Sequence, residues 1–334
     1  MLPQRFESAD WMVRLRHRPS GYRALAAVLA FGACSFLPAS ANAQQLSRTL
    51  GVSADNDFFN FWIPPRQRSD DNYSHGMRLA WNPSATPKLE RTVLCSSGDA
   101  CGWKLEIGQE MYTPTVDTPV PLPGQRPYAG WLYGRIAVGS GNDRTFRNIG
   151  ITAGVTGPAS LAETVQESFH KQFGFRHPLG WRYQLATEPA FAITAGQSWR
   201  IAPKDASRFV DFVPVGSVSL GTLRTSASAA GRIRVGTNLE HPWMAARSRS
   251  RFALQLFLGG KFEAVAHDLF LDGNTFERSI HVDAKWNRSE WERGFRIGIG
   301  RVTMEYGVTT QSREYTTGPP GHTYSSLGLS WALN

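Results

Sequence analysis

The segment NIGITAGV at Asn148–Val155 carries the pattern that decides the fold. Isoleucine, alanine or valine stands at every second position, and asparagine, glycine or threonine stands between them. Successive side chains of a strand point to opposite faces, so this segment has one apolar face and one polar or small face. It is therefore interpreted as a β-strand.

The same alternation recurs along the chain and predicts about twelve strands. In 302–308, for example, Val302, Met304, Tyr306 and Val308 alternate with threonine, glutamate and glycine. The predicted fold class is therefore all-β. The other ten stretches are 46–55, 73–81, 103–112, 128–139, 189–199, 207–220, 227–236, 252–258, 291–300 and 323–333.

The N-terminus has the features of an export signal. Arginines precede the apolar run 24–37, and Ala41-Asn42-Ala43 matches the small-x-small pattern that signal peptidase cleaves. We therefore expect residues 1–43 to be a signal peptide and residues 44–334 to form one mature domain. Lipoprotein processing at Cys34 is the alternative.

The charge distribution gives no indication of a nucleic-acid partner. The formal net charge is +9, and removal of the leader, with five arginines against Glu7 and Asp10, lowers it to +6. The excess is scattered, without a basic stripe or an aromatic-basic motif. An anionic partner at a membrane surface fits this pattern better than DNA does.

Cysteine usage agrees with export from the cytoplasm. Two cysteines, Cys95 and Cys101, remain after cleavage, and a short turn of five residues separates them. In an oxidising periplasm we expect them to pair, and two free thiols are the alternative.

Periodicity alone does not distinguish a soluble sandwich, whose apolar faces point inward, from a membrane barrel, whose apolar faces point outward. Three features favour a transmembrane antiparallel β-barrel: the signal peptide, tryptophans near strand ends, and arginines on the opposite strand faces. Connections also alternate between short ones, as at 141–144, and long ones, as at 156–188, which is typical of barrels with tight periplasmic turns and large extracellular loops. The tryptophans are Trp62, Trp81, Trp131, Trp199 and Trp331, and the expected lumen arginines are Arg78, Arg232, Arg234 and Arg296.

One stretch, Leu161–Trp181, has the spacing of an amphipathic helix instead of a strand. Gln166 and His170 stand four residues apart, so in a helix they project from the same face. In the barrel topology this short helix lies in the third long extracellular loop, beside the first two strand ends and their Asn56-Asp57 and 70–76 segments. A surface helix whose polar face merely carries a histidine is the alternative.

Counting alternate residues does not place these polar residues on one face. Ser74 shares a face with Gly76 and Arg78 in the expected lumen, and Asp57 also points to the lumen. Asn56 points the other way, so the two neighbours would straddle the wall unless the strand end bulges. Simple turn capping by Asn56 and Asp57, and an ordinary small lumen residue at Ser74, therefore stay open.

Eight short motifs are spread in order over most of the mature chain. They are Asn56-Asp57, Tyr73-Ser-His-Gly, Tyr112-Thr-Pro, RPYAGWLY at Arg126–Tyr133, GVTGP at Gly154–Pro158, Gln166 with His170, Gly180-Trp181, and Gln184 with Glu188-Pro189. In content and spacing the set resembles the LpxR-type lipid A deacylases of the Gram-negative outer membrane. The chain departs from that pattern at Ser74-His75, where relatives often have threonine followed by a small or amide residue, in ending on Asn334 instead of phenylalanine, and in its cysteine turn.

This resemblance implies a twelve-stranded outer-membrane barrel whose active site faces the outer leaflet. The family removes the 3′-linked acyloxyacyl group from lipid A of lipopolysaccharide and requires calcium. Carried over residue by residue, the resemblance makes His170 the general base that activates water, and places Asn56, Ser74 and Gln166 in the active site. Asp57 is the candidate ligand for Ca²⁺, which prefers hard oxygen donors.

Two other functions stay open on the sequence alone. One is a different outer-membrane lipid esterase, such as a phospholipase, and the other is a structural or transport barrel without chemistry. Arg126–Tyr133 is interpreted as a packing motif, with Arg126 also a candidate contact for substrate phosphates. His75, His177 and His267 are interpreted as loop or interface histidines.

Overall fold

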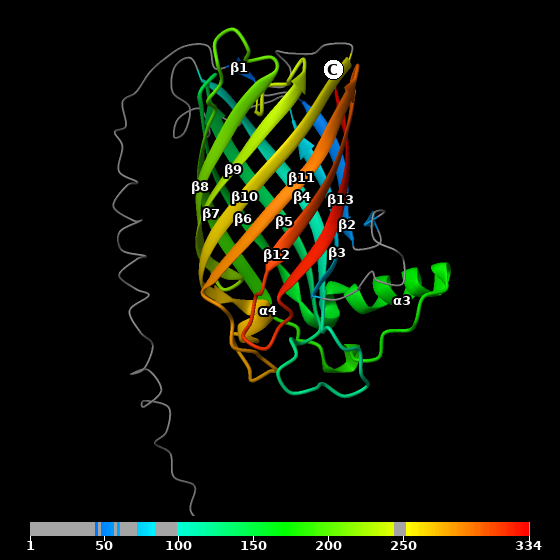
Figure 1. Ribbon diagram of the computed structural model, residues 1–334. Coiled ribbons are helices and arrows are strands. Elements are labelled where there is room, and N and C mark those ends of the chain that lie inside the picture. The colour runs from blue at the N-terminus through cyan, green and yellow to red at the C-terminus, as the bar shows by residue number, and fades with distance from the viewer. Residues whose placement is uncertain are drawn as a thin grey trace, which may run out of the picture. The chain divides into compact units, whose positions relative to one another are not determined.

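Twelve antiparallel strands close into a β-barrel in the computed structural model, which describes residues 44–45, 48–56, 59–60, 72–83, 99–243 and 252–333 (Figure 1). This confirms the predicted fold class and strand number. The barrel strands are β2 Thr49–Asn56, β3 Asn72–Asn82, β4 Ala100–Thr113, β5 Ala129–Gly141, β6 Thr145–Thr156, β7 Pro189–Trp199, β8 Val210–Leu220, β9 Arg224–Thr237, β10 Phe252–Asp268, β11 Asn287–Ile299, β12 Val302–Ser312 and β13 Gly321–Ala332. The other elements are β1 Gln44–Gln45, η4 Gly157–Ser160, α3 Ala162–Phe173, η5 Trp181–Tyr183 and α4 Leu269–Asp272.

Backbone hydrogen bonds run around the whole wall. Each barrel strand pairs with the strands before and after it, and β13 returns to β2, with Leu327 opposite Ala54. β1 adds a short parallel pairing to the start of β4, with Gln44 opposite Ala100. Because the wall closes on itself, the backbone groups of the strands are satisfied without water, as a membrane requires.

The apolar face of each strand points outward. Large apolar side chains on alternate strand positions are exposed on the outer wall, where lipid would cover them. This arrangement excludes the sandwich alternative, which would bury these faces. Examples are Leu50 and Val52 in β2, Met77 and Leu79 in β3, Ile107 in β4, Ile136 in β5, Ile149 and Ile151 in β6, Ile233 and Val235 in β9, and Leu256 and Leu258 in β10.

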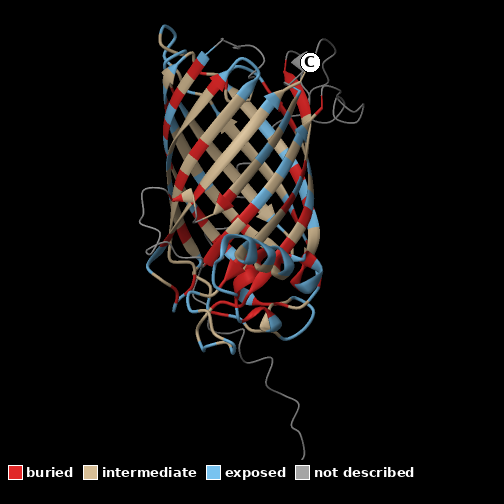
Figure 2. Ribbon diagram, turned by 90° about the vertical axis from the view of Figure 1, so that its right-hand side faces the viewer, coloured by how far each residue is buried: buried red, intermediate tan, exposed pale blue. Residues whose placement is uncertain are grey.

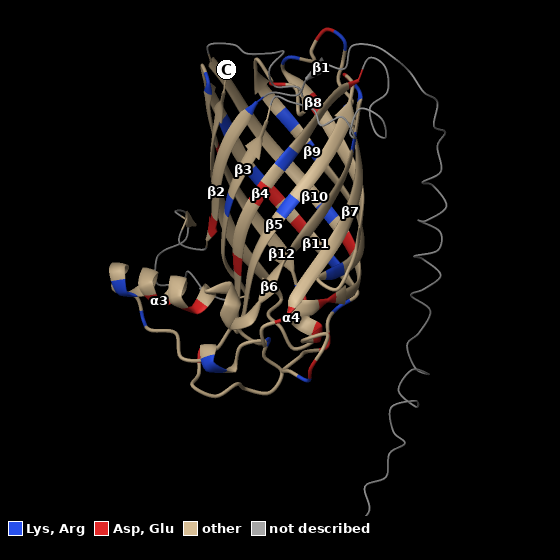
Figure 3. Cartoon of the chain, turned by 180° about the vertical axis from the view of Figure 1, so that it is seen from behind, with Lys and Arg blue, Asp and Glu red and all other residues tan. Residues whose placement is uncertain are grey.

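Charged residues stand along the barrel strands (Figure 3). Their side chains line the lumen, where they pair with one another. All four arginines predicted to face the lumen form ion pairs there: Arg78 with Asp55 at 2.5 Å, Arg232 with Glu292 at 2.6 Å, Arg234 with Asp211 at 2.6 Å and Arg296 with Glu240 at 3.1 Å. A cavity of about 820 Å³ remains between these groups.

The two ends of the barrel differ in their connections. We call the end that carries α3 the α3 rim and the end that carries β1 and the C-terminus the terminal rim (Figure 1). The prediction that short connections lie at one rim and long connections at the other was wrong in part. The α3 rim includes the three-residue turn 221–223, and the terminal rim includes the longer connections 83–99 and 238–251. The long connections 114–128, 157–188 and 269–286 do share the α3 rim, as predicted.

Aromatic side chains and α4 fill the barrel mouth at the α3 rim, where buried residues gather (Figure 2). Phe270 of α4 stacks on Tyr112 with ring centroids 4.4 Å apart and meets Trp131 edge-on. Trp131 lies near the start of β5, as predicted, and it is almost fully buried in this cluster. Trp81, Trp199 and Trp331 are exposed, and Trp62 lies outside the described residues.

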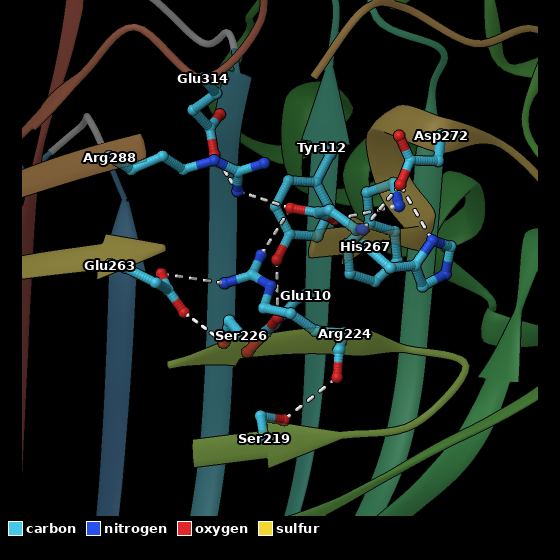
Figure 4. A network of polar contacts seen from close by, with 12 residues as sticks. Glu110, Tyr112, Ser219, Arg224, Ser226, Glu263, His267, Asp272, Arg288 and Glu314 are labelled. Atoms are coloured by element: carbon cyan, nitrogen blue, oxygen red, sulfur yellow. Dashed lines mark hydrogen bonds and ion pairs between the residues drawn. The ribbon is translucent and has the colours of Figure 1, made fainter. Parts of the chain in front are cut away.

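An ion-pair network holds α4 in the mouth (Figure 4). Asp268 caps α4 by accepting a hydrogen bond from the Phe270 amide. The same carboxylate accepts hydrogen bonds from Arg224 at 3.0 Å and from Arg288 at 2.6 Å. Because both arginines extend from the wall, the charge that caps the helix also ties it to the strands.

Neither helix of the described chain is long and apolar enough to cross a membrane. Cys101 is disulfide-bonded. The other two cysteines, Cys34 and Cys95, lie outside the described residues, as does the predicted signal peptide, 1–43.

Replacing Asp211 should destabilise the barrel. Its side chain is fully buried and pairs with both Arg200, at 2.8 Å, and Arg234, so Asp211→Asn leaves the buried Arg234 and the partly buried Arg200 without their counter-charge. We expect a loss of about 3–5 kcal/mol in the free energy of unfolding, measured by urea unfolding of the barrel in lipid vesicles. Glu305→Gln is the control, because this lumen carboxylate is about one third exposed and should contribute no more than about 1 kcal/mol. Equal losses in both variants would contradict the prediction.

Candidate functional site

Two of the predicted site residues, Asn56 and Ser74, meet where β2 ends and β3 begins. Asn56 stands opposite His75 in the strand register. Its side-chain amide donates a hydrogen bond to the Ser74 carbonyl at 3.0 Å and lies 3.4 Å from Nδ1 of His75. His75, which we interpreted as a loop or interface histidine, is therefore a strand residue beside the candidate site.

A β-bulge at Ser74 decides which way these residues point. The pairing of β3 with β4 shifts between Tyr73 and His75, so Ser74 is an extra residue on β3. Tyr73 therefore points into the lumen, where its hydroxyl donates to Asp55 at 2.8 Å. Ser74 is fully buried and its hydroxyl hydrogen-bonds that of Thr113.

The bulge corrects the parity argument for Ser74. Thr113 lies on the outward face of β4, four residues beyond Gln109 and opposite in direction to the lumen residue Tyr112. Ser74 thus belongs to the outer side of the wall, not to the lumen face with Arg78. Asn56 is on the outer side as well, since its neighbour Asp55 faces the lumen. The bulge predicted at the end of β2, which would bring Asn56 and Asp57 to one side of the wall, stays a prediction, because Asp57 lies outside the described residues.

The RPYAGW motif begins β5 and supports α3 from the barrel wall. Tyr128 packs on Trp181 with ring centroids 4.9 Å apart, and both pack with Met111 of β4 and Ala162 of α3. Gly130 faces the helical segment so closely that a Cβ atom there would overlap Ser160 and Ala162. The motif is therefore a packing motif, as predicted.

Met111 connects the two halves of the candidate site. It stands opposite His75 in the strand register, and its buried side chain packs against Ala162 and Trp181. The outward end of β3 and the base of α3 are thus neighbours on the outer wall. Gln109, on the same face of β4, adds a hydrogen bond from its amide to the Ser160 carbonyl at 2.6 Å.

Helix α3 projects outward from the wall at the α3 rim (Figures 1 and 3). It is shorter than predicted, because Gly174 adopts the left-handed conformation that ends a helix. The rest of the predicted helical stretch is a return loop, 174–180, followed by η5. This loop brings Trp181 back under the helix.

The carboxamide of Gln166 is part of a clamp between α3 and η5. Its Oε1 accepts a hydrogen bond from the indole N–H of Trp181 at 2.7 Å, and both side chains are buried. A second link runs from Asp117, which accepts hydrogen bonds from the Tyr128 hydroxyl at 2.6 Å and from the Leu179 amide at 2.9 Å. The sequence offered no spacing signal for the Gln166–Trp181 pair.

His170 lies one turn beyond Gln166 on the same side of α3. Its Nδ1 hydrogen-bonds the carbonyl of Arg176 in the return loop, and its ring meets Phe175 edge-on. A carbonyl oxygen can only accept, so Nδ1 carries the proton in neutral His170 and Nε2 carries the lone pair. The return loop therefore selects the tautomer in which Nε2 is the basic atom.

Arg126 is directed away from the outer surface. It is almost fully buried, pairs with Glu314 at 2.8 Å and lies over the ring of Tyr112. The prediction that it contacts substrate phosphates is therefore wrong in this structure. Glu188 similarly holds loops together, since its carboxylate accepts hydrogen bonds from the amides of Thr275 and Phe276.

No group of three or more histidine, cysteine, aspartate or glutamate side chains is arranged to hold a metal within the described residues. Asp57, the candidate calcium ligand, lies outside them. The described chain on either side of it, Asn56 and Asn60, lies along the outer wall, where Asn60 donates to the Thr323 carbonyl at 3.0 Å. Calcium therefore stays a proposal.

The fold and the site together define an outer-membrane β-barrel that carries polar residues on its outer wall beneath a projecting helix. A comparison with protein-family models matches the family described as outer membrane protein LpxR over residues 25–333. The chain belongs to this family.

One solved structure shows the same fold. The chain is similar to LpxR from Salmonella typhimurium, with a TM-score of 0.72 and 18% identity over 85% of this chain and 100% of that chain. The β domain of the Bordetella autotransporter BrkA aligns with a TM-score of 0.44 and 9% identity over 87% of this chain and 100% of that chain. A comparison with curated proteins gives no match.

Adding one methyl group at Gly130 should displace the base of α3. The new Cβ would overlap Ser160 and Ala162, so we expect Gly130→Ala to weaken local stability by about 1–3 kcal/mol. Hydrogen exchange of residues 157–173 should become faster. Gly134→Ala is the matched control on the same face of β5, since its Cβ meets no atom within 4 Å. Equal exchange in the two variants would show that α3 does not depend on this contact.

Removing the indole N–H of Trp181 should loosen the clamp. In Trp181→Phe the buried Oε1 of Gln166 loses this donor while the ring contact with Tyr128 is largely kept, at an expected cost of about 1–3 kcal/mol. Limited proteolysis should then cut the return loop faster. The exposed Trp286 provides the control, Trp286→Phe, which should leave the cleavage rate unchanged. An unchanged rate in Trp181→Phe would argue against the clamp.

Proposed function

We propose that this chain is a lipid A 3′-O-deacylase that hydrolyses the ester of the 3′-linked acyloxyacyl group. Membership of the LpxR family over nearly the whole chain supports this proposal. One observation of the structure supports it further: polar side chains gather on the outer wall at the rim, beside an apolar belt, where a lipid headgroup meets its acyl chains. A soluble substrate would not require a site in this position.

In this proposal His170 is the general base. Its Nε2 takes a proton from water as the water oxygen attacks the ester carbonyl carbon, and a tetrahedral intermediate forms. The intermediate then expels the 3′-oxygen of the sugar, which takes the proton from the imidazolium. The products are a fatty acid carrying its own acyl chain and a lipid A with a free 3′-hydroxyl group.

The hydrogen bond from Nδ1 to the Arg176 carbonyl supports this role. It keeps the lone pair on Nε2 and stabilises the imidazolium that forms during attack. We assign Asn56 and Ser74 to the substrate side of the site. Gln166 acts with them by holding the helix that carries the base.

We propose Asp57, together with oxygen atoms near Asn56, as the calcium-binding position. Calcium prefers such hard oxygen donors and would stabilise negative charge on the carbonyl oxygen of the ester. The proposed orientation places the α3 rim outside the cell and the terminal rim in the periplasm. The site then faces the outer leaflet, where lipid A resides.

His170→Asn should abolish deacylation without unfolding the barrel. The asparagine amide is a donor at the position of Nδ1, but it is not a base at neutral pH. We expect the rate to fall by about 10²–10⁴-fold. The measurement is mass spectrometry of lipid A after incubation with purified, refolded protein.

His177→Asn is the matched control. This exposed histidine lies seven residues away in the return loop and should leave the rate unchanged. Parallel reactions with calcium and with a chelator test the metal proposal, because activity should be lost in the chelator. Intact lipid A with the folded wild-type protein would refute the function, and release of fatty acid from phospholipids instead would identify a phospholipase.

A further inference from the structure

One face of α3 is apolar along its whole length and stays exposed away from the wall. Ala162, Val165, Phe169 and Phe173 follow one another at intervals of three or four residues, so they lie on one side of the helix. Ala162 is buried against the barrel. By contrast, Val165, Phe169 and Phe173 are 39%, 37% and 58% exposed.

The exposed phenylalanines form a cluster. The rings of Phe169 and Phe173 lie 4.6 Å apart, and Phe175 from the return loop stacks 6.0 Å from Phe169. The opposite face of the helix carries Glu167 and Lys171. The segment thus has the form of an amphipathic helix that lies in a membrane interface, with aromatic residues on one side and charges on the other.

The apolar face of α3 continues the apolar belt of the barrel. Ile107, which is 63% exposed, lies on the same outward face of β4 as Gln109 and Met111. Gln109 and Met111 are the residues that hold the base of α3. Lipid that covers Ile107 therefore reaches the point where the helix leaves the wall, and the exposed phenylalanines begin two turns further along.

We propose that the apolar face of α3 is embedded among the acyl chains of the membrane leaflet at the α3 rim, beside β3 and β4. The partner is lipid, not protein, because this face is continuous with a surface that lipid already covers. The helix then lies in the interface and holds chains next to the flank that carries Gln166 and His170. This inference rests on the outer-membrane barrel alone and does not require the proposed catalysis.

Photo-crosslinking tests the position of this face without measuring turnover. Phe173→p-benzoylphenylalanine protein, reconstituted in vesicles of phosphatidylethanolamine and phosphatidylglycerol and irradiated, should form lipid adducts detected by mass spectrometry. The label at Ile107 is the positive control and reports insertion of the barrel. The label at Lys171, two residues away on the opposite face, should form no lipid adduct.

Each outcome decides the proposal. Adducts at 107 and 173, without adducts at 171, would support an embedded apolar face. Adducts at 107 alone would show that α3 stands in water and would overturn it. Equal adducts at 171 and 173 would also overturn it, because the helix would then have no lipid-facing side. None of these results depends on whether lipid A is hydrolysed.

Discussion

Satisfaction of backbone hydrogen bonds in a medium without water is the constraint on which the rest of this structure depends. A sheet in lipid cannot leave an edge unpaired, so β13 must return to β2 and the wall must close. In a closed barrel, side chains at alternate positions of every strand face either the lipid or the lumen. Side chains such as Ile107 then belong outside, and charged groups such as Arg234 need partners inside. The buried ion pair of Arg234 with Asp211 thus follows from placing charged side chains inside a closed barrel, where each charge needs a partner.

The same constraint explains why the candidate site lies on the outer wall at a rim. Ion pairs occupy the lumen, and Phe270 and its aromatic neighbours fill the mouth, so a lipid has no route to a site inside. A polar site that must meet lipid is restricted to the boundary between the belt and the loops. The bulge at Ser74 serves this placement, because it turns Tyr73 inward and leaves the serine on the outer side beside Asn56.

Period-two alternation was enough to predict the strands, because the two faces of a strand meet different surroundings and so differ at every second residue. The choice of a barrel over a sandwich needed the predicted signal peptide, the tryptophans near strand ends and the arginines as well. The four lumen arginines follow from the same count. The count fails at Ser74, since one inserted residue reverses the parity beyond it. It also has no means of pairing Gln166 with Trp181, which lie fifteen residues apart and meet only because Gly174 ends the helix and the chain turns back. Arg126 carries a charge like a phosphate-binding residue, and only its burial against Glu314 shows a structural role.

The start of β5 shows how closely the site and the barrel depend on one another. Three positions of the RPYAGW motif serve the two sides of the wall: Tyr128 packs on Trp181 and Gly130 leaves space for the base of α3 outside, whereas Trp131 packs in the mouth. The size of each side chain must fit the space on its own side of the wall. A change in packing at one position therefore cannot be compensated by a substitution at a position on the other side. The position of α3, which carries His170, therefore depends on the packing at the start of β5. In the proposed mechanism a rigid wall at this point would keep His170, on the projecting helix, in position relative to Asn56 and Ser74, which belong to the wall itself.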